Sequence, residues 1–174
     1  MLTLTALEQR HLATLAKWRG AMDLVGPGPL EPHFEDAARA VAWLEEPAGV
    51  WADLGSGAGF PGVALAARHP QLTVHLVESR QKRATFLRQL KAGTVHCARS
   101  ESLSDASYDG VISRAYRPPP DFLADALRLL KPGGMAVLML ARQEPPQVEG
   151  LQMFHVEHYE VEGRPRQAVG YRKL

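Results

Sequence analysis

The stretch that most constrains the fold is DLGSGAGFPG at residues 53–62. It follows the apolar run VWA at 50–52 and precedes a helical pattern at 63–68. Glycines let the backbone adopt positive φ and let a ligand approach closely, and the start of a helix presents free N–H groups and a positive dipole. The stretch therefore predicts a strand, a tight turn and a helix start that form the floor of a nucleotide-type cofactor site.

The glycine spacing alone leaves several interpretations open. The glycines of residues 55–62 read G-x-G-x-G-x-x-G, which also contains the dinucleotide fingerprint G-x-G-x-x-G. A methyltransferase is favoured because Asp53 can accept a hydrogen bond from a cationic amino group and Pro61 fits a first helical turn. The sequence KPGG at 131–134, before another apolar run, is habitual in class I methyltransferases. A turn without a ligand is the remaining alternative, and it is disfavoured by the conformational entropy cost of so many glycines.

Strand-like and helix-like segments alternate from residue 50 onward. Strands are expected at 50–54, 72–77, 94–98, 108–113 and 135–140, and helices at 61–69, 81–91 and 121–130, the last capped by Asp121. Such alternation implies a doubly wound, mostly parallel sheet. Two β-like stretches near 153–161 and 167–173 predict a C-terminal antiparallel hairpin.

The chain is expected to be a single α/β methyltransferase domain over residues 1–174. Two helices, at about 2–22 and 32–45, form an N-terminal helical cap within residues 1–48, and residues 49–174 form a Rossmann-like core. The length of 174 residues is sufficient to bury a core of ordinary size.

Composition excludes several classes of protein. The single cysteine, Cys97, cannot form an internal disulfide framework and fits a reducing compartment. No apolar run approaches the roughly 20 residues that span a bilayer, and no signal peptide is evident. We therefore expect a cytoplasmic protein without a membrane partner. The net charge of +1 does not indicate nucleic-acid binding. The basic side chains of the helix at 80–91 either form a solvated surface or contact a phosphate backbone.

Polar side chains follow the predicted strands at the edge where doubly wound sheets bind ligands. Glu78 ends the second strand, 23 residues after Gly55, where an acidic residue accepts hydrogen bonds from ribose hydroxyls. Ser100 and Glu101 follow the third strand and are expected either at an adenine ring or simply in a turn and helix cap. Arg114 ends the fourth strand, where it would hold a phosphate or base, or pair with a carboxylate.

The histidines do not predict a metal site. None of the seven has metal-ligand spacing with Cys97, and His155 and His158 lie at i and i+3 of a predicted strand, on opposite faces. His33 precedes Phe34 on the second helix, and its position alone indicates a surface or helix-cap residue.

As a set, these motifs identify a resemblance. The chain resembles the bacterial 16S ribosomal RNA guanine-N7 methyltransferases, also called glucose-inhibited division protein B (RsmG), as a short and divergent member. The similarity covers about residues 18–140 and is carried by the following segments: DLGSGAGFPG at 53–62, ES at 78–79, KR at 82–83, FLR at 86–88 and DGVISRA at 109–115.

The resemblance implies S-adenosylmethionine as cofactor and guanine N7 of 16S ribosomal RNA as acceptor. The substrate is expected to be either the free RNA or a small-subunit particle, and the enzyme is expected to be a monomer. Guanine N7 carries an unprotonated lone pair, so no general base is required and the task is in-line positioning. The base must come from a loop or unpaired region, because the RNA major groove is narrow.

Candidate site residues follow from the motifs and the resemblance together. The candidate cofactor contacts are Asp53, Gly55, Ser56, Gly57, Gly59, Phe60, Glu78, Ser79, Ser100, Glu101 and Arg114. Arg114 is also expected between cofactor and substrate, with His33 and Arg142 as further substrate-side candidates.

The chain departs from the family pattern mainly on the substrate side. Asp23-Leu24-Val25 stands where the family has Asn-Leu-Thr, and Ala141-Arg142 stands where it usually has a lysine and a glycine. Three other functions therefore stay open: methylation of another RNA, a protein or a small molecule; ribosome-associated cofactor binding without turnover; and, more distantly, a nicotinamide dehydrogenase.

Overall fold

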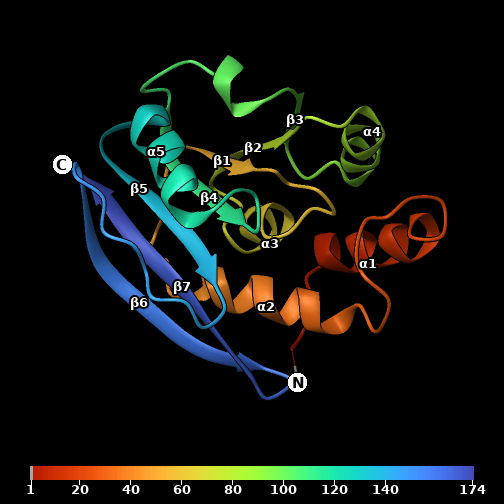
Figure 1. Cartoon of the computed structure of the whole chain (residues 1–174). Coiled ribbons are helices and arrows are strands. Elements are labelled where there is room, and N and C mark those ends of the chain that lie inside the picture. Colours follow the sequence, from red (N-terminus) through yellow and green to blue (C-terminus); the bar gives the residue numbers. More distant parts are fainter. Residues whose placement is uncertain (1) are drawn as a thin grey trace.

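The computed structural model describes residues 2–174. Its elements are α1 (Ala6–Trp18), α2 (Glu31–Ala42), β1 (Val50–Leu54), α3 (Gly62–Arg68), β2 (Thr73–Glu78), α4 (Gln81–Leu90), β3 (Thr94–Cys97), a 3₁₀ turn η1 (Ser100–Ser102), β4 (Tyr108–Arg114), α5 (Pro119–Leu129), β5 (Leu130–Leu140), β6 (Leu151–Val161) and β7 (Arg164–Lys173) (Figure 1).

The strands form one sheet in the order β3-β2-β1-β4-β5-β7-β6. The pairs among β1 to β5 are parallel, whereas β7 runs antiparallel to both β5 and β6. The strand order reverses between β1 and β4, and a crevice opens at the carboxyl ends of the strands at such a switch point. The expected doubly wound sheet and the C-terminal hairpin are both confirmed.

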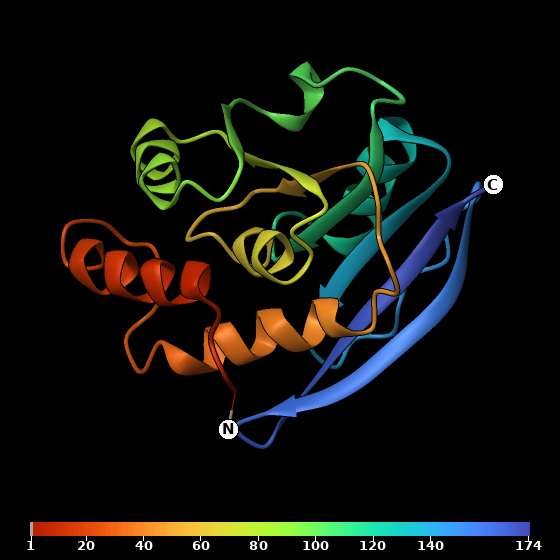
Figure 2. The same ribbon diagram turned by 180° about the vertical axis from the view of Figure 1, so that it is seen from behind.

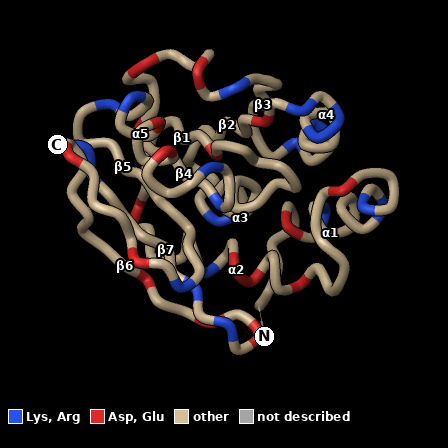
Figure 3. The backbone as a smooth tube through the Cα atoms, in the orientation of Figure 1, with Lys and Arg blue, Asp and Glu red and all other residues tan. Residues whose placement is uncertain are grey.

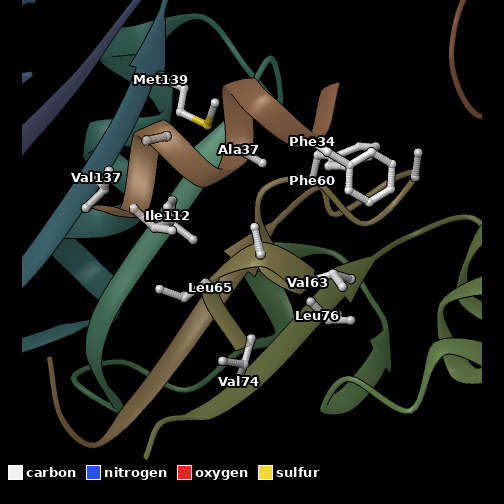
Figure 4. Close-up of a cluster of buried hydrophobic side chains, with 14 of the residues drawn as sticks. Phe34, Ala37, Phe60, Val63, Leu65, Val74, Leu76, Ile112, Val137 and Met139 are labelled. Atoms are coloured by element: carbon white, nitrogen blue, oxygen red, sulfur yellow. The ribbon is translucent and has the colours of Figure 1, made fainter. Parts of the chain in front are cut away.

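Helices cover both faces of the sheet. The helices α2 and α3 lie on one face with α1 and α4 beside them, and α5 covers the other face (Figures 1 and 2). Figure 4 shows Phe34 and Ala37 of α2 and Val63 of α3 in one buried cluster with the sheet residues Leu76 and Ile112. A fully buried Phe or Val side chain contributes about 1.5–3 kcal/mol, so this cluster helps to hold α2 and α3 on the sheet.

A buried carboxylate docks the first helix. Thr5 caps α1 through a capping box with Glu8, which explains why the helix begins at Ala6. Glu8 is fully buried, and its oxygens accept hydrogen bonds from Arg68 at the end of α3, at 2.9 and 3.0 Å. The helix α1 is thereby tied to the helix that follows the glycine turn.

Several expected boundaries were wrong. The helix α1 covers Ala6–Trp18 and not residues 2–22, and α2 ends at Ala42 and not at 45. The helix α5 begins at Pro119 with Pro118 as its N-cap, and Asp121 lies in the first turn, because proline at the first positions has no N–H for a cap to satisfy. The strand β5 begins at Leu130, which pairs with Tyr108 before the chain bulges and resumes its pairing at Met135. Across residues 2–174, every helix is too short or too polar to cross a membrane.

Candidate active site at the carboxyl edge of the sheet

The glycine turn is a chain of left-handed residues fixed by its own hydrogen bonds. Gly55, Gly57 and Gly59 have φ of +68°, +53° and +97°, a backbone region that costs a residue with a Cβ atom about 1–2 kcal/mol. Between them, the Ser56 amide donates to the carbonyl of Val77 at 3.0 Å, and its hydroxyl donates to the Asp53 carbonyl at 2.9 Å. The turn is therefore shaped without any ligand.

Asp53 supports the turn from below. Its side chain is fully buried, and Oδ2 accepts the Gly62 amide at the start of α3 at 3.0 Å. Oδ1 has no hydrogen-bond partner among the described residues, and burial raises the pKa of this carboxyl to about 7. The structure places the Asp53 carboxylate beneath the turn, where it holds the backbone. That Asp53 also accepts a hydrogen bond from an amino group of a ligand stays a prediction.

Glu78 supports the turn from the end of β2. Its Oε2 accepts the Gly57 amide at 3.0 Å, and its Oε1 accepts the Arg80 amide at 2.8 Å. Only 5% of Glu78 is exposed, yet it lines an open hollow beside the turn. The carboxylate that sequence analysis assigns to ribose hydroxyls thus lies at the edge of a cavity, with its orientation already fixed.

That hollow, which we call the glycine-turn compartment, has a volume of about 290 Å³. Its lining includes Gly55, Glu78, Ser79 and Ser100, four of the predicted cofactor residues, together with Tyr116 and Arg117. A Cβ atom at Gly57 would lie 3.7 Å from the Gly55 carbonyl oxygen and 3.9 Å from Arg83 Nη1, which are ordinary contact distances beside the lining of the compartment. Carboxylate, hydroxyl and amide groups around an open cavity match the donors and acceptors of a nucleoside.

Tyr116 and Arg117, which we call the dividing loop, close one side of this compartment. The Tyr116 ring lies on Gly55 so closely that a Cβ atom at residue 55 would overlap it. The Tyr116 hydroxyl donates to the Ser100 hydroxyl at 2.8 Å, and that hydroxyl donates to Asp125 at 3.2 Å. Position 55 therefore requires glycine for packing as well as for its backbone angle.

Arg117 fixes the segment predicted to lie at an adenine ring. Its guanidinium donates to Asp125 at 3.1 Å and also pairs with Glu101. The hydrogen bond from Arg117 lowers the pKa of the exposed Glu101 carboxyl to about 2. Sequence reasoning missed Asp125, which lies within α5 and whose position in the sequence gave no signal of these contacts.

A second cavity, the central crevice, lies on the other side of the dividing loop. It has a volume of about 380 Å³, and its lining includes His33, Asp36, Arg114 and Arg166. The Arg114 guanidinium pairs with Asp36 at 3.3 Å, and Tyr159 donates to the other Asp36 oxygen at 2.8 Å. Of the roles expected for Arg114, the structure therefore contains the carboxylate pair, and the arginine still lines the crevice.

Phe60 supports Arg114 from within the core. Its ring is 3% exposed, stacks on His33 at 5.7 Å between centroids and meets Phe34 edge-on at 4.9 Å. Arg114 lies over the same ring at 4.9 Å, a cation–π contact of about 0.5–1 kcal/mol. Burial lowers the pKa of His33, with Arg114 lowering it further. Phe60 holds these two crevice residues in place, and cofactor contact by it stays a prediction.

His11 of α1 is a part of the turn that sequence reasoning did not assign. It is buried, and Nε2 lies 2.7 Å from the carbonyl of Ala58. Burial lowers the pKa of His11 to about 4, so the ring is neutral at pH 7, and its Nε2–H donates because a carbonyl only accepts. A lone histidine on a helix gave no signal of this contact.

Arg142 lies outside the central crevice. It is exposed in the connection between β5 and β6 and borders a neighbouring hollow with Arg164 and Arg166. No group of three or more His, Cys, Asp or Glu side chains within residues 2–174 could hold a metal ion.

The sheet order, the glycine turn and the acidic end of β2 define a class I methyltransferase fold. Solved structures agree: a predicted O-methyltransferase from Agrobacterium tumefaciens superposes with a TM-score of 0.62 at 24% identity, covering 79% of this chain and 80% of that one. TYW2 from M. jannaschii, solved in complex with AdoMet, superposes with a TM-score of 0.62 at 17% identity, covering 87% and 80%.

Sequence comparison gives the family. The model of the GidB family, described as rRNA small subunit methyltransferase G, matches residues 5–163. Two proteins named ribosomal RNA small subunit methyltransferase G are similar: one from Rhodospirillum centenum, 40% identical over 75% of this chain and 64% of its own length, and one from Paracoccus denitrificans, 33% identical over 83% and 82%. The chain belongs to this family. The expected fold class, family and S-adenosylmethionine cofactor are thereby confirmed.

Proposed function

We propose that this protein transfers a methyl group from S-adenosylmethionine to N7 of a guanine in 16S ribosomal RNA. Family membership supports the reaction. The observation that carries the proposal is the pair of cavities at the carboxyl ends of the strands, one beside the glycine turn and one lined by Arg114, with the dividing loop between them. A donor site and an acceptor site must adjoin in this way for direct transfer.

The residues of the glycine-turn compartment are those that would hold the cofactor. Glu78 and Ser100 offer a carboxylate and a hydroxyl, and the positive-φ turn at Gly55 and Gly57 lets a ligand approach the backbone. When bound, S-adenosylmethionine supplies a methyl group on a sulfonium, an electrophile that a neutral ring nitrogen can attack. The remaining work belongs to the residues that orient the acceptor.

The central crevice contains no strong base in position to remove a proton, and guanine N7 requires none. Asp36 is engaged by Arg114 and by Tyr159, and burial lowers the pKa of His33, which makes it a weaker base than an exposed histidine. Arg114 is fixed by a carboxylate on one side and an aromatic face on the other, and a guanidinium held in this way is a rigid set of donors. Arg114 would orient the base through O6 or a phosphate and leave N7 free.

The test uses labelled S-adenosylmethionine and small-subunit RNA, offered free and as 30S particles, from cells that lack the guanine-N7 methyltransferase. Label is mapped by chemical cleavage at N7-methylguanine. A single labelled guanine is the expected result. Cofactor binding without label on either substrate would contradict the proposal and indicate another acceptor or a protein that binds the cofactor without turnover.

A further inference from the structure

Three arginines gather at the open side of the central crevice. Arg142 comes from the connection after β5, and Arg164 and Arg166 come from the start of β7; together they line a hollow of about 470 Å³. We call these three residues the arginine rim. Arg142 and Arg164 are exposed, and Arg166 is half-buried. Figure 3 shows basic positions at this end of the β6–β7 hairpin as well as on α4.

The rim differs from the other arginines around the crevice in having no carboxylate partner. Arg114 and Arg117 each pair with an acidic side chain. Among the salt bridges of residues 2–174, none involves a rim arginine, and Arg166 donates only to the carbonyl of Pro165, at 3.2 Å. The rim guanidiniums therefore keep most of their donors for a ligand.

The rim is continuous with the central crevice. Arg166 lines the rim hollow, the crevice itself and a third hollow of about 310 Å³ that includes His33 and Asp36. Glu162 also borders this third hollow, so the positive surface is bounded by a carboxylate on that side. A chain lying along the rim would thus pass directly over the entrance that leads to Arg114.

The two segments that carry the rim are pinned to each other. Gln167 Nε2 donates to the carbonyl of Gln143 at 2.6 Å, and Leu140 pairs with Gln167 in the sheet. Arg142 and Arg166 therefore come from backbone with a fixed spacing. Binding through such a fixed arrangement loses less entropy than binding through mobile segments.

We propose that the arginine rim holds the phosphate backbone of the RNA on either side of the nucleotide that enters the crevice. The basic helix α4 does not take part in this backbone contact. This inference rests on the proposed function for the nature of the substrate. Guanidinium groups bind phosphate through paired hydrogen bonds, and every phosphate neutralised releases counterions. The helix α4 packs against α1, β2 and β3, on the opposite side of the switch point from the rim.

The experiment compares two variants that each lose two positive charges. The rim variant is Arg142→Gln with Arg164→Gln, and the matched control is Arg88→Gln on α4 with Lys91→Gln at its C-cap, all at exposed positions. Binding of 16S ribosomal RNA, offered free and as 30S particles, is measured at several salt concentrations with adenosylhomocysteine present. The affinity for adenosylhomocysteine alone and the Tm show that each variant is folded.

We expect the rim variant to lose at least about tenfold in RNA affinity near 100 mM salt and the slope of log K against log salt to fall by about 1–2. The α4 control should keep the wild-type slope. An unchanged slope in the rim variant, or an equal loss in the control, would overturn the inference while leaving the proposed function intact. A wild-type protein that binds neither form of the RNA would overturn both.

Discussion

The two cavities on either side of the dividing loop are built in different ways. The glycine-turn compartment is shaped by backbone: its turn is fixed by bonds to Asp53, Val77 and Glu78, from strands that pair directly with each other. The central crevice is shaped by side chains from distant segments, such as Asp36 and Tyr159, which are 123 positions apart. In the proposed function, cofactor binding would therefore depend on a local motif, whereas acceptor binding would depend on assembly of the whole chain.

The largest expected effect separates turnover from cofactor binding. Arg114→Ala should lower kcat by about 100-fold, the usual cost of removing one group positioned at a reacting centre, because the guanidinium is the best-fixed donor of the central crevice. The affinity for adenosylhomocysteine, measured by calorimetry, should change by less than about threefold. The comparison fails if the Tm falls sharply while activity survives, since Arg114 would then be structural.

The second prediction reverses that pattern. Gly57→Val should weaken adenosylhomocysteine binding by at least about tenfold, because its side chain would stand beside Gly55 and Arg83, which both line the glycine-turn compartment. Gly133→Val is a matched control, since Gly133 also has positive φ and has no neighbour within 4 Å of a Cβ atom, but lies in the bulge of β5. Both variants should lose about 1–2 kcal/mol of stability from backbone strain. Equal calorimetric affinities in the two variants would contradict a ligand role for the turn.

The third prediction concerns the carboxylate beneath the turn. The pKa of Asp53 is about 7 in the folded protein and about 4 when unfolded, so the folded state holds an extra proton between these values. The contribution of this protonated carboxyl to the free energy of unfolding is fully present below pH 4 and is lost as the pH rises through 7. Asp53→Asn should therefore gain stability over wild type as the pH rises through this window, by about 2 kcal/mol near its middle and about 4 kcal/mol at and above pH 7. Chemical denaturation at several pH values measures it, and a constant difference would place the pKa elsewhere.

The smallest expected effect tests whether α1 stabilises the glycine turn. Because the pKa of His11 is lowered to about 4, its contribution to stability is present above pH 6.5 and lost as pH falls through 4. His11→Gln keeps a donor for the Ala58 carbonyl and should remove only this acid dependence. His11→Leu should also lose about 1 kcal/mol, because it leaves that carbonyl unpaired. Identical pH profiles for wild type and both variants would contradict the lowered pKa, and equal stability of wild type and His11→Leu at pH 7 would show that the bond is unimportant.

The sequence predicted the fold well because each strand and helix carries its own pattern. The strands at 50–54 and the hairpin were placed correctly, since period-two and period-3.6 patterns and turn residues are local signals. The boundary errors came from proline and glycine: Pro119 began α5 early, and the KPGG segment became a bulge within β5. Local propensity alone does not show where a strand resumes pairing.

The site was only partly predictable from the sequence. Local patterns indicate the residues of the glycine-turn compartment, but they do not indicate contacts between distant segments. Gly55, Glu78 and Ser100 follow strands in a known order, so they could be expected at one cavity. Asp125 and His11 act through contacts between segments far apart in sequence, such as the 47 positions between His11 and Ala58, and Arg166 lines the crevice beside the distant His33 and Asp36. No spacing rule reports such contacts.

The docking of α1 has a consequence for motion. Glu8 ties α1 to the end of α3, and His11 ties it to the glycine turn, so detachment of α1 would break a contact with the turn and a contact with the helix that follows it. Detachment of α1 and cofactor binding are then competing equilibria, and linkage requires each to oppose the other equally. Amide hydrogen exchange within α1 should slow when adenosylhomocysteine binds, although the helix lines neither cavity. The N-terminal helix thus reports occupancy of a site that it does not touch.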